Sequence, residues 1–306
     1  MALPKAGLYR LLPTEQPNPA TRGIDLDSTA KILRKINRQD ALVARAVARE
    51  ARHIALGVDA IVRSLRAGGR LLFAGAGTSG RLGVLEAAEC PPTFGIPPSL
   101  VRAVMAGGAK AVFRSKEGAE DDAADGARQA GRRVRPGDVV VGIAASGVTP
   151  FVRGALREGK RRGCATILVT SSKGKAIPEA AIVISPAVGP EVVSGSTRLK
   201  SGTAAKLVLN MLTTAAMIRL GKVYDHWMVD LRLTSRKLKL RGVRIVCDLG
   251  GVSPARARAV LSRCGGSVKT AVLAARLGLS AREARERLAG AEGSLRAALG
   301  EQGCRV

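Results

Sequence analysis

The sequence predicts an α/β protein built on a doubly wound parallel sheet. Five short apolar runs alternate with helix-sized segments, at residues 71–74, 100–105, 139–144, 166–170 and 181–184. This alternation is typical of βα units, in which each crossover helix covers one face of the sheet. The 306 residues are enough for one large domain or two small ones.

Helical patterns flank the predicted sheet on both sides. Ser28 is expected to cap a long helix that reaches about Leu65 and stops at Gly68-Gly69. A second long helix is predicted from about Thr197 to Arg219, and the chain beyond it shows no clear strand. Within that last part, Ser280 and Glu283 form a predicted capping box. We therefore divide the chain into a lead and helix (1–55), a sheet domain (56–222) and a helical module (223–306).

The charge is strongly positive, with 50 Lys and Arg against 24 Asp and Glu, a formal net charge of +26. Such an excess raises nucleic acid or an anionic membrane as partners. The chain nevertheless has few aromatic side chains for base stacking, no run of five basic residues and no apolar stretch of transmembrane length. We expect a solvated basic surface and a small anionic ligand, with neither a membrane nor nucleic acid as partner.

Cysteine and histidine usage predicts a metal-free cytoplasmic protein. The 5 cysteines are widely spaced without a C-x-x-C pair, which favours reduced thiols. His53 and His226 stand alone, so a metal site would depend almost wholly on carboxylates. The first ten residues lack the pattern of a signal peptide.

The most specific local motif is the glycine-rich segment from Gly75 to Arg81, which follows the first predicted strand and opens a helix. It satisfies G-x-G-x-x-G, but residues 90–116 contain none of the acidic residues that a dinucleotide site requires. A P-loop is excluded because Arg81-Leu82 stand where Lys and Ser or Thr are needed. The remaining interpretation is a turn whose free N–H groups and hydroxyls suit a monophosphate.

Similar hydroxyl-rich turns follow a later strand, at residues 144–150, and precede the second long helix, at residues 194–197. Each alone is typical of a helix N-cap. Together, on one edge of a parallel sheet, they predict a site for a phosphorylated polyol. The candidate binding residues are Thr78, Ser79, Gly80, Ser146, Gly147, Thr149, Ser194, Ser196 and Thr197.

Acid–base candidates are few in the sheet region. Glu86 and Glu89 share a face of the helix opened by the first turn, and Glu89 is predicted to end it, just before Pro91-Pro92. A second acidic cluster, residues 117–122, lies at a predicted helix start, where carboxylates also stabilise the helix dipole. No G-x-S-x-G elbow supports serine hydrolase chemistry.

Long blocks of the chain resemble one family, the N-acetylmuramic acid 6-phosphate etherases of the sugar isomerase (SIS) group. The matching blocks cover almost the whole chain, from Thr14-Glu15 and Asn18-Pro19 through residues 74–95, 117–121, 144–147, 189–204 and 228–231. The resemblance implies a homodimeric three-layer α/β/α sandwich with a five-stranded parallel sheet and a ubiquitin-associated-like C-terminal bundle.

The activity implied by the resemblance is cleavage of the D-lactyl ether of N-acetylmuramic acid 6-phosphate. The products are N-acetylglucosamine 6-phosphate and D-lactate, in cytoplasmic recycling of the cell-wall amino sugar, without a metal or other cofactor. The catalytic carboxylates of the family fall on Glu89 and Glu120. Elimination followed by water addition needs an acid for the leaving lactate and a base for the C2 proton, and two carboxylates in unlike environments can supply both.

Three positions depart from the family pattern, and at two of them Val148 and Pro17 stand where the family commonly has arginine. Glu86 likewise replaces an aspartate. These departures bear on substrate preference more than on fold. A non-catalytic SIS regulator that senses a sugar phosphate, and a sugar-phosphate isomerase, are the alternative interpretations. Retention of both Glu89 and Glu120 favours the enzyme over the regulator.

Overall fold

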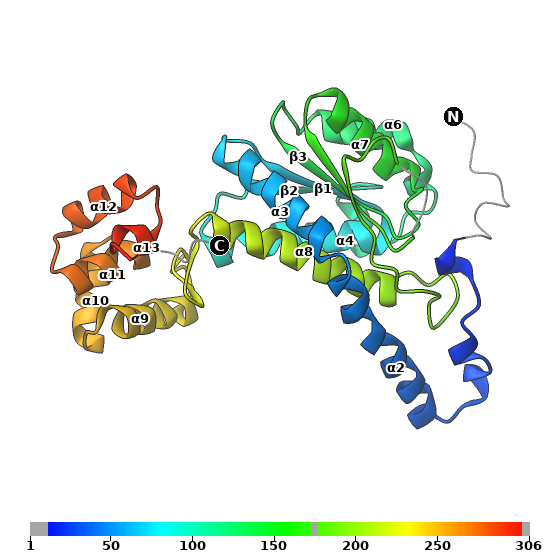
Figure 1. Cartoon of the computed structure of the whole chain (residues 1–306), viewed down its shortest axis with the longest axis horizontal. Coiled ribbons are helices and arrows are strands. Elements are labelled where there is room, and N and C mark those ends of the chain that lie inside the picture. The colour runs from blue at the N-terminus through cyan, green and yellow to red at the C-terminus, as the bar shows by residue number, and fades with distance from the viewer. Residues whose placement is uncertain (1–11, 173–176, 302–306) are drawn as a thin grey trace. The chain divides into compact units, whose positions relative to one another are not determined.

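The computed structural model describes residues 12–172 and 177–301. The chain forms two compact units, each described here by itself (Figure 1). The first consists of Met1–Ala88 and Pro98–Thr213, and the second of Glu89–Pro97 and Thr214–Val306. The division at residues 55 and 222 stays a prediction.

A five-stranded parallel sheet forms the centre of the first unit, as predicted. The strands follow the five apolar runs: β1 (Leu71–Gly75), β2 (Val101–Met105), β3 (Val139–Ile143), β4 (Ala165–Val169) and β5 (Ile182–Ile184). Their order is β2-β1-β3-β4-β5, and every neighbouring pair is parallel. All residues of β1 and β3 are buried, because helices cover both faces of the sheet.

The two faces of the sheet are covered by different helices (Figure 1). On one face α6 (Ala123–Gly131) and α7 (Pro150–Arg161) pack against the sheet through a core that includes Phe151 and Leu156. On the other lie α3 (Ala51–Arg66), α4 (Gly77–Phe94) and α8 (Lys200–Arg219). There a Cβ on Gly57 of α3 would lie 2.8 Å from Leu212 of α8 and 3.5 Å from Ile167 of β4. The result is the predicted three-layer sandwich.

The first predicted helix is two helices, so the expectation of one continuous helix is wrong. The segment splits into α2 (Thr29–Ala48) and α3, with the break at Arg49-Glu50. Glu50 is buried, and its carboxylate accepts hydrogen bonds from the backbone N–H of Ser185 and from His53. The break therefore coincides with the point where Glu50 is anchored to the end of β5.

The end predicted for α4 is also wrong, because the helix continues through Pro91 and Pro92 to Phe94. Proline lacks the backbone N–H that continues a helix, and for this reason the sequence predicted that the helix ends at Glu89. Cys90 and Phe94 are both buried and hold the last turn in place. Gly95 then turns the chain at φ 65°, and a Cβ there would lie 2.1 Å from the carbonyl oxygen of Asp230.

The N-terminal lead contains the short 3₁₀ turns η1 (Pro13–Glu15), η2 (Pro19–Thr21) and η3 (Ile24–Leu26). It lies along residues 190–195. The carbonyl of Thr14 accepts from Gly195 N–H at 2.9 Å, and the Thr21 hydroxyl donates to the Val192 carbonyl at 2.9 Å. The Asn18 amide donates to the Pro190 carbonyl at 3.1 Å. The lead thus supports the loop that precedes α8.

Two short helical elements connect the strands of the first unit, namely α5 (Lys110–Phe113) and η4 (Ala119–Asp121). The second unit is mainly helical, with α9 (Arg236–Gly250), α10 (Pro254–Arg263), α11 (Val268–Leu277), α12 (Ala281–Gly290) and α13 (Leu295–Ala298). Its core includes Ile245, Ala257 and Leu273. The predicted capping box of Ser280 and Glu283 is confirmed at the start of α12.

The expectation that this part contains no strand is wrong, because β6 (Val223–Tyr224) and β7 (Trp227–Met228) pair as an antiparallel hairpin. Each strand has only two residues, too few for an alternating pattern. The ubiquitin-associated-like character of the helical module stays a prediction.

The ion pairs of Glu179 predict a measurable acid sensitivity of the fold. Burial raises the pKa of this carboxyl, but hydrogen bonds from Arg157 and Arg153 outweigh burial and hold the pKa below the ordinary 4.5. The stability contributed is present above pH 4.5 and is lost as the pH falls through the folded-state pKa. Glu179→Gln should therefore flatten the fall of the unfolding free energy between about pH 5 and 3, by at most about 1.4 kcal/mol per pH unit. Denaturant titrations at each pH measure the unfolding free energy, and Glu286→Gln is the control at an exposed glutamate. Equal pH dependence of the unfolding free energy in wild type and Glu179→Gln would contradict the prediction.

Candidate functional site

The strand order creates a switch point between β1 and β3. The chain continues from β1 outward to β2, then returns to β3 on the other side of β1 and proceeds to β4 and β5. Ligands of doubly wound sheets bind outside the carboxyl ends of the strands at such a point. Two of the three predicted turns, residues 75–81 and 144–150, follow these two strands. The sheet therefore places both turns at the edge where doubly wound sheets commonly bind ligands.

The first turn is tight because two glycines meet in it. A Cβ on Gly75 would lie 2.6 Å from the backbone nitrogen of Gly80, so no side chain fits there. Thr78 and Ser79 lie in the first turn of α4, where backbone N–H groups have no partner within the helix. Their hydroxyls make no hydrogen bond within residues 12–172 and 177–301. These donors are therefore available to an anion.

Arg81, in contrast, is already engaged. Its guanidinium donates to the carbonyls of Val112, at 2.8 Å, and Ala111, at 2.9 Å. These carbonyls lie at the end of α5, where helical carbonyl groups lack an intrahelical donor. Arg81 thus ties the α4 helix to the segment that follows β2.

The second turn forms a compact loop at the start of α7. The Ser146 hydroxyl accepts a hydrogen bond from Val148 N–H at 3.3 Å, and Gly147 has φ 74°. Thr149 is the N-cap residue of α7, but its side chain makes no capping hydrogen bond. Val148 is half-buried in this turn.

Sequence reasoning missed three hydroxyl residues at the switch point, namely Thr170, Ser171 and Ser201. They line a narrow pocket, which we call the switch-point pocket, together with Ser79, Ile143, Ala145, Val169, Pro186 and Ala205. Thr170 and Ser171 directly follow β4, so the strand-end rule that found the other turns could have found them. Ser201 lies in the first turn of α8, and its buried hydroxyl has no hydrogen-bond partner within the described residues.

The third predicted turn, with Ser194, Ser196 and Thr197, lies on the loop before α8; of all the predicted binding residues only Ser79 lines the switch-point pocket in the described part of the chain. The exposed Ser194 hydroxyl donates to the Gln16 carbonyl of the N-terminal lead. The N-terminus of α8 is already capped by Glu191, whose carboxylate accepts from the N–H groups of Lys200 and Ser201, both at 2.9 Å. Because Glu191 is fully buried, its negative charge disfavours a second anion at this helix end.

The acidic candidates differ in burial. Glu86 is buried and accepts from Lys206 at 2.8 Å and from the hydroxyl of Thr213. Glu89, on α4, and Glu120, in η4, are both exposed. In the part of the chain that the structure describes, neither carboxylate has a hydrogen bond or ion pair. Glu86 is thus engaged in packing α4 against α8, whereas Glu89 and Glu120 are exposed and unpaired among the described residues.

Neither a metal-binding cluster nor a membrane-spanning helix occurs among the described residues. Among residues 12–172 and 177–301, no group of three or more His, Cys, Asp or Glu side chains is placed to hold a metal ion. No helix in the same residues is long and apolar enough to cross a membrane.

The class of protein follows from the sheet and from a family model. Residues 53–160, which include β1, β2, β3 and the turns after β1 and β3, match the family described as "Glucokinase regulatory protein N-terminal SIS domain". The chain therefore contains an SIS domain. A solved phosphoheptose isomerase from Francisella tularensis is 19% identical, with a TM-score of 0.47 over 63% of this chain and 98% of that chain.

Curated relatives identify the family more narrowly. An N-acetylmuramic acid 6-phosphate etherase of Symbiobacterium thermophilum is 56% identical over 82% of this chain and 84% of that protein. A protein of the same name from Salinibacter ruber is 52% identical over 94% of both chains. The chain belongs to the N-acetylmuramic acid 6-phosphate etherase family, as its sequence blocks predicted.

Proposed function

We propose that this protein cleaves the D-lactyl ether of N-acetylmuramic acid 6-phosphate with water, giving N-acetylglucosamine 6-phosphate and D-lactate. The observation that carries the proposal is a glycine-rich turn at the switch point of an SIS sheet, in a chain about half identical to etherases along most of its length. Unengaged donors at the N-terminus of α4 suit the phosphate.

Glu89 and Glu120 are the proposed catalytic residues. In the open-chain sugar, C2 lies beside the C1 aldehyde, so its proton can be removed by a carboxylate, which we assign to Glu120. The C3–O bond then breaks, and Glu89 protonates the departing lactate oxygen because an alkoxide leaves poorly. Water next adds to the unsaturated aldehyde: Glu89 takes its proton as OH bonds to C3, and C2 regains a proton. Both carboxylates are exposed and have no partner among the described residues, so neither is engaged in holding the fold together.

The phosphate is proposed to bind at the turns after β1 and β3, through Thr78, Ser79, Gly80, Ser146, Gly147 and Thr149. Ser194, Ser196 and Thr197 stay in the proposal as a further part of the site. They lie on the loop that the N-terminal lead supports, so they are proposed to contact the sugar and not the phosphate.

Replacement of Ser79 by alanine tests the phosphate site. The hydroxyl lines the switch-point pocket and has no partner in the described chain, so its loss should remove a ligand contact without disturbing the fold. The KM for N-acetylmuramic acid 6-phosphate should rise about tenfold, the effect of one hydrogen bond to a charged group. Ser262→Ala, at an exposed serine of the second unit, is the matched control. An unchanged KM for Ser79→Ala would contradict this placement of the phosphate.

A homodimer is the proposed assembly, and α2 supports it. Only Val43, Ala46 and Val47 of its 20 residues are buried, although the helix is amphipathic. Leu33 is 60% exposed and Leu42 44% exposed. The two leucines lie on opposite sides of the buried stripe of α2, and exposed leucines on an amphipathic helix are typical of an interface. Leu33→Glu should shift the sedimentation of the protein from dimer to monomer, and a wild-type monomer would contradict the proposal.

We further propose a cytoplasmic location. The family relationship supports it, because the substrate carries a phosphate and its recycling proceeds inside the cell. Cys164, Cys247 and Cys264 form no disulfide in the described part of the chain, which suits a reducing compartment.

D-lactate release by the purified full chain tests the proposed function. The protein is incubated with N-acetylmuramic acid 6-phosphate in the presence of a chelator, and lactate is measured with a D-specific dehydrogenase. Equimolar D-lactate and N-acetylglucosamine 6-phosphate are expected. Substrate binding without release would instead support the sugar-phosphate regulator, the class that the matched family model describes.

A further inference from the structure

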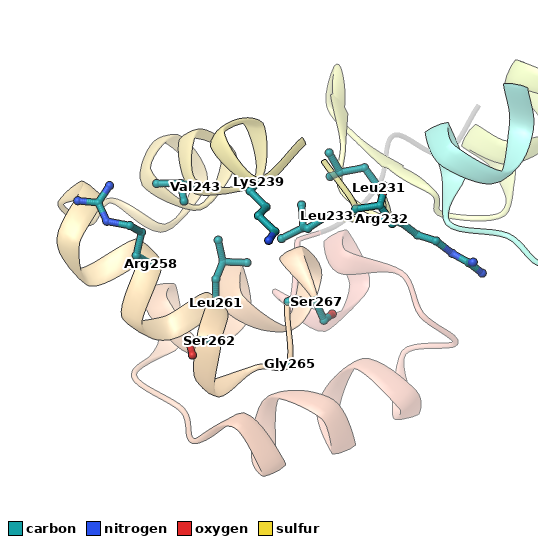
Figure 2. A pocket seen from close by; sticks show the side chains of 12 residues that line it. Leu231, Arg232, Leu233, Lys239, Val243, Arg258, Leu261, Ser262, Gly265 and Ser267 are labelled. Atoms are coloured by element: carbon teal, nitrogen blue, oxygen red, sulfur yellow. The ribbon is translucent and has the colours of Figure 1, made fainter. Parts of the chain in front are cut away.

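The second unit carries a depression of about 780 Å³ that the proposed reaction does not use (Figure 2). It lies between α9, the end of α10 and the segment that leads into α9. Its apolar lining includes Leu231, Leu233, Val243 and Leu261, and its charged lining residues are Arg232, Lys239 and Arg258. No carboxylate lines it. We call this depression the α9 groove.

Lys239 gives the α9 groove its chemical character. Figure 2 shows its side chain extending from α9 toward Leu261 on α10, inside the apolar lining. Within the described residues, neither the Lys239 ammonium nor the Arg258 guanidinium has a hydrogen bond or ion pair. Unpaired cations beside apolar side chains fit a partner that brings carboxylates next to apolar groups.

A second depression lies on another side of α9. It is lined by Trp227, Leu240, Arg241 and Arg244, among others, and Leu240 is 62% exposed. Arg244 there is paired with Asp248 at 3.4 Å and lies over the Trp227 ring, so the second depression differs from the α9 groove in its charge pairing. Amphipathic helices bind in apolar grooves such as the α9 groove through a row of apolar side chains.

Charge, apolar contacts and shape together argue against three other partners for the α9 groove: a second copy of the chain, nucleic acid and a membrane. The same face of a second copy would bring Lys239 and Arg258 against like charges, which costs binding energy. Nucleic acid satisfies the cations but offers no aliphatic side chain for Leu233, Val243 and Leu261. A membrane is flat, whereas the apolar residues line a depression.

We infer that the α9 groove binds an acidic amphipathic helix of a partner protein. Apolar residues of that helix occupy the groove, and carboxylates flanking them pair with Lys239 and Arg258. This inference goes beyond the proposed etherase activity and does not depend on it.

The test uses the full chain and a fluorescent synthetic peptide of about 18 residues, with leucines at helical spacing and glutamates elsewhere. A second peptide carries glutamine in place of every glutamate. At low salt the acidic peptide should bind at least about tenfold more tightly than its glutamine counterpart. Lys239→Glu should weaken binding of the acidic peptide at least about tenfold, and Lys239→Met should reduce the preference for the acidic peptide, of which the part due to Arg258 remains.

Arg285→Glu is the matched control, because it makes the same charge change at an exposed residue of α12 outside both depressions. It should change binding less than about twofold. The far-ultraviolet circular dichroism and the thermal unfolding midpoint of every variant report that the fold is intact. Equal binding of the two peptides, or an equal loss in Lys239→Glu and Arg285→Glu, would overturn the inference.

Two further results would also overturn it in favour of other occupants. One is tighter binding of duplex DNA than of the acidic peptide, weakened by Lys239→Glu. The other is loss of self-association in Lys239→Glu, measured by sedimentation, which would assign the groove to a second copy.

Discussion

Glu89→Gln is expected to lower the rate of D-lactate release by about 10² to 10⁴, the usual contribution of a general acid. Glutamine keeps the size of the side chain but cannot protonate the departing lactate oxygen. Glu89 is exposed and has no partner within residues 12–172 and 177–301, so the substitution should leave the fold unchanged. Glu117→Gln, at an exposed glutamate of the same chain, should keep near-normal turnover. Near-normal turnover in Glu89→Gln would show that another group protonates lactate.

Comparison of two single variants, Glu89→Gln and Glu120→Gln, separates the roles of the two carboxylates. Exchange of the C2 proton with solvent deuterium reports the first step alone. Glu89→Gln should still exchange this proton while releasing little lactate, whereas Glu120→Gln should lose exchange and release together. The reverse pattern would exchange the two assignments.

Gly154→Ala is expected to destabilise the protein by about 3 kcal/mol or more, although alanine normally favours a helix. Gly154 lies in α7, and a Cβ there would be 2.0 Å from the carbonyl oxygen of Ala123 at the start of α6. Gly126 is the reciprocal position, where a Cβ would be 2.0 Å from the carbonyl oxygen of Phe151. The two helices therefore touch through their backbones, and neither can yield without moving the face of the sheet they cover.

The control for this prediction is Gly290→Ala in α12, where a Cβ would meet no atom within 4 Å. It should be neutral or stabilise by up to about 1 kcal/mol. Urea unfolding followed by far-ultraviolet circular dichroism measures both variants. Equal midpoints for Gly154→Ala and wild type would mean that α6 and α7 are not in backbone contact.

The sheet could be predicted because its strands are buried on both faces and read as continuous apolar runs between glycine-rich turns. Helix boundaries were harder to predict, since they depend on tertiary contacts. The break between α2 and α3 is fixed by Glu50 binding Ser185, which is 135 positions away in sequence. The passage of α4 through Pro91 and Pro92 contradicts local propensity and is held by the burial of Cys90 and Phe94.

The candidate site could be predicted only in part, because some of its features depend on local sequence and others on tertiary contacts. Glycine-rich turns at strand ends carry a local signal, which located Ser79 and Ser146. The engagement of Glu86 by Lys206, and of the α8 N-terminus by Glu191, depends on distant side chains that no local pattern reveals. The same holds for Ser201, whose hydroxyl reaches the switch-point pocket only because α8 packs beside α4.

The most direct test of the proposed reaction is the fate of oxygen from isotopically heavy water during turnover of N-acetylmuramic acid 6-phosphate. Elimination followed by water addition places one heavy oxygen at C3 of N-acetylglucosamine 6-phosphate and none in the hydroxyl of D-lactate. The isotope shift of the C3 carbon resonance measures the label. Reading the label at C3 keeps it separate from the C1 oxygen, which exchanges with water unaided. Heavy oxygen in the lactate hydroxyl would show that the bond between lactate and the ether oxygen breaks instead, and would contradict elimination followed by water addition.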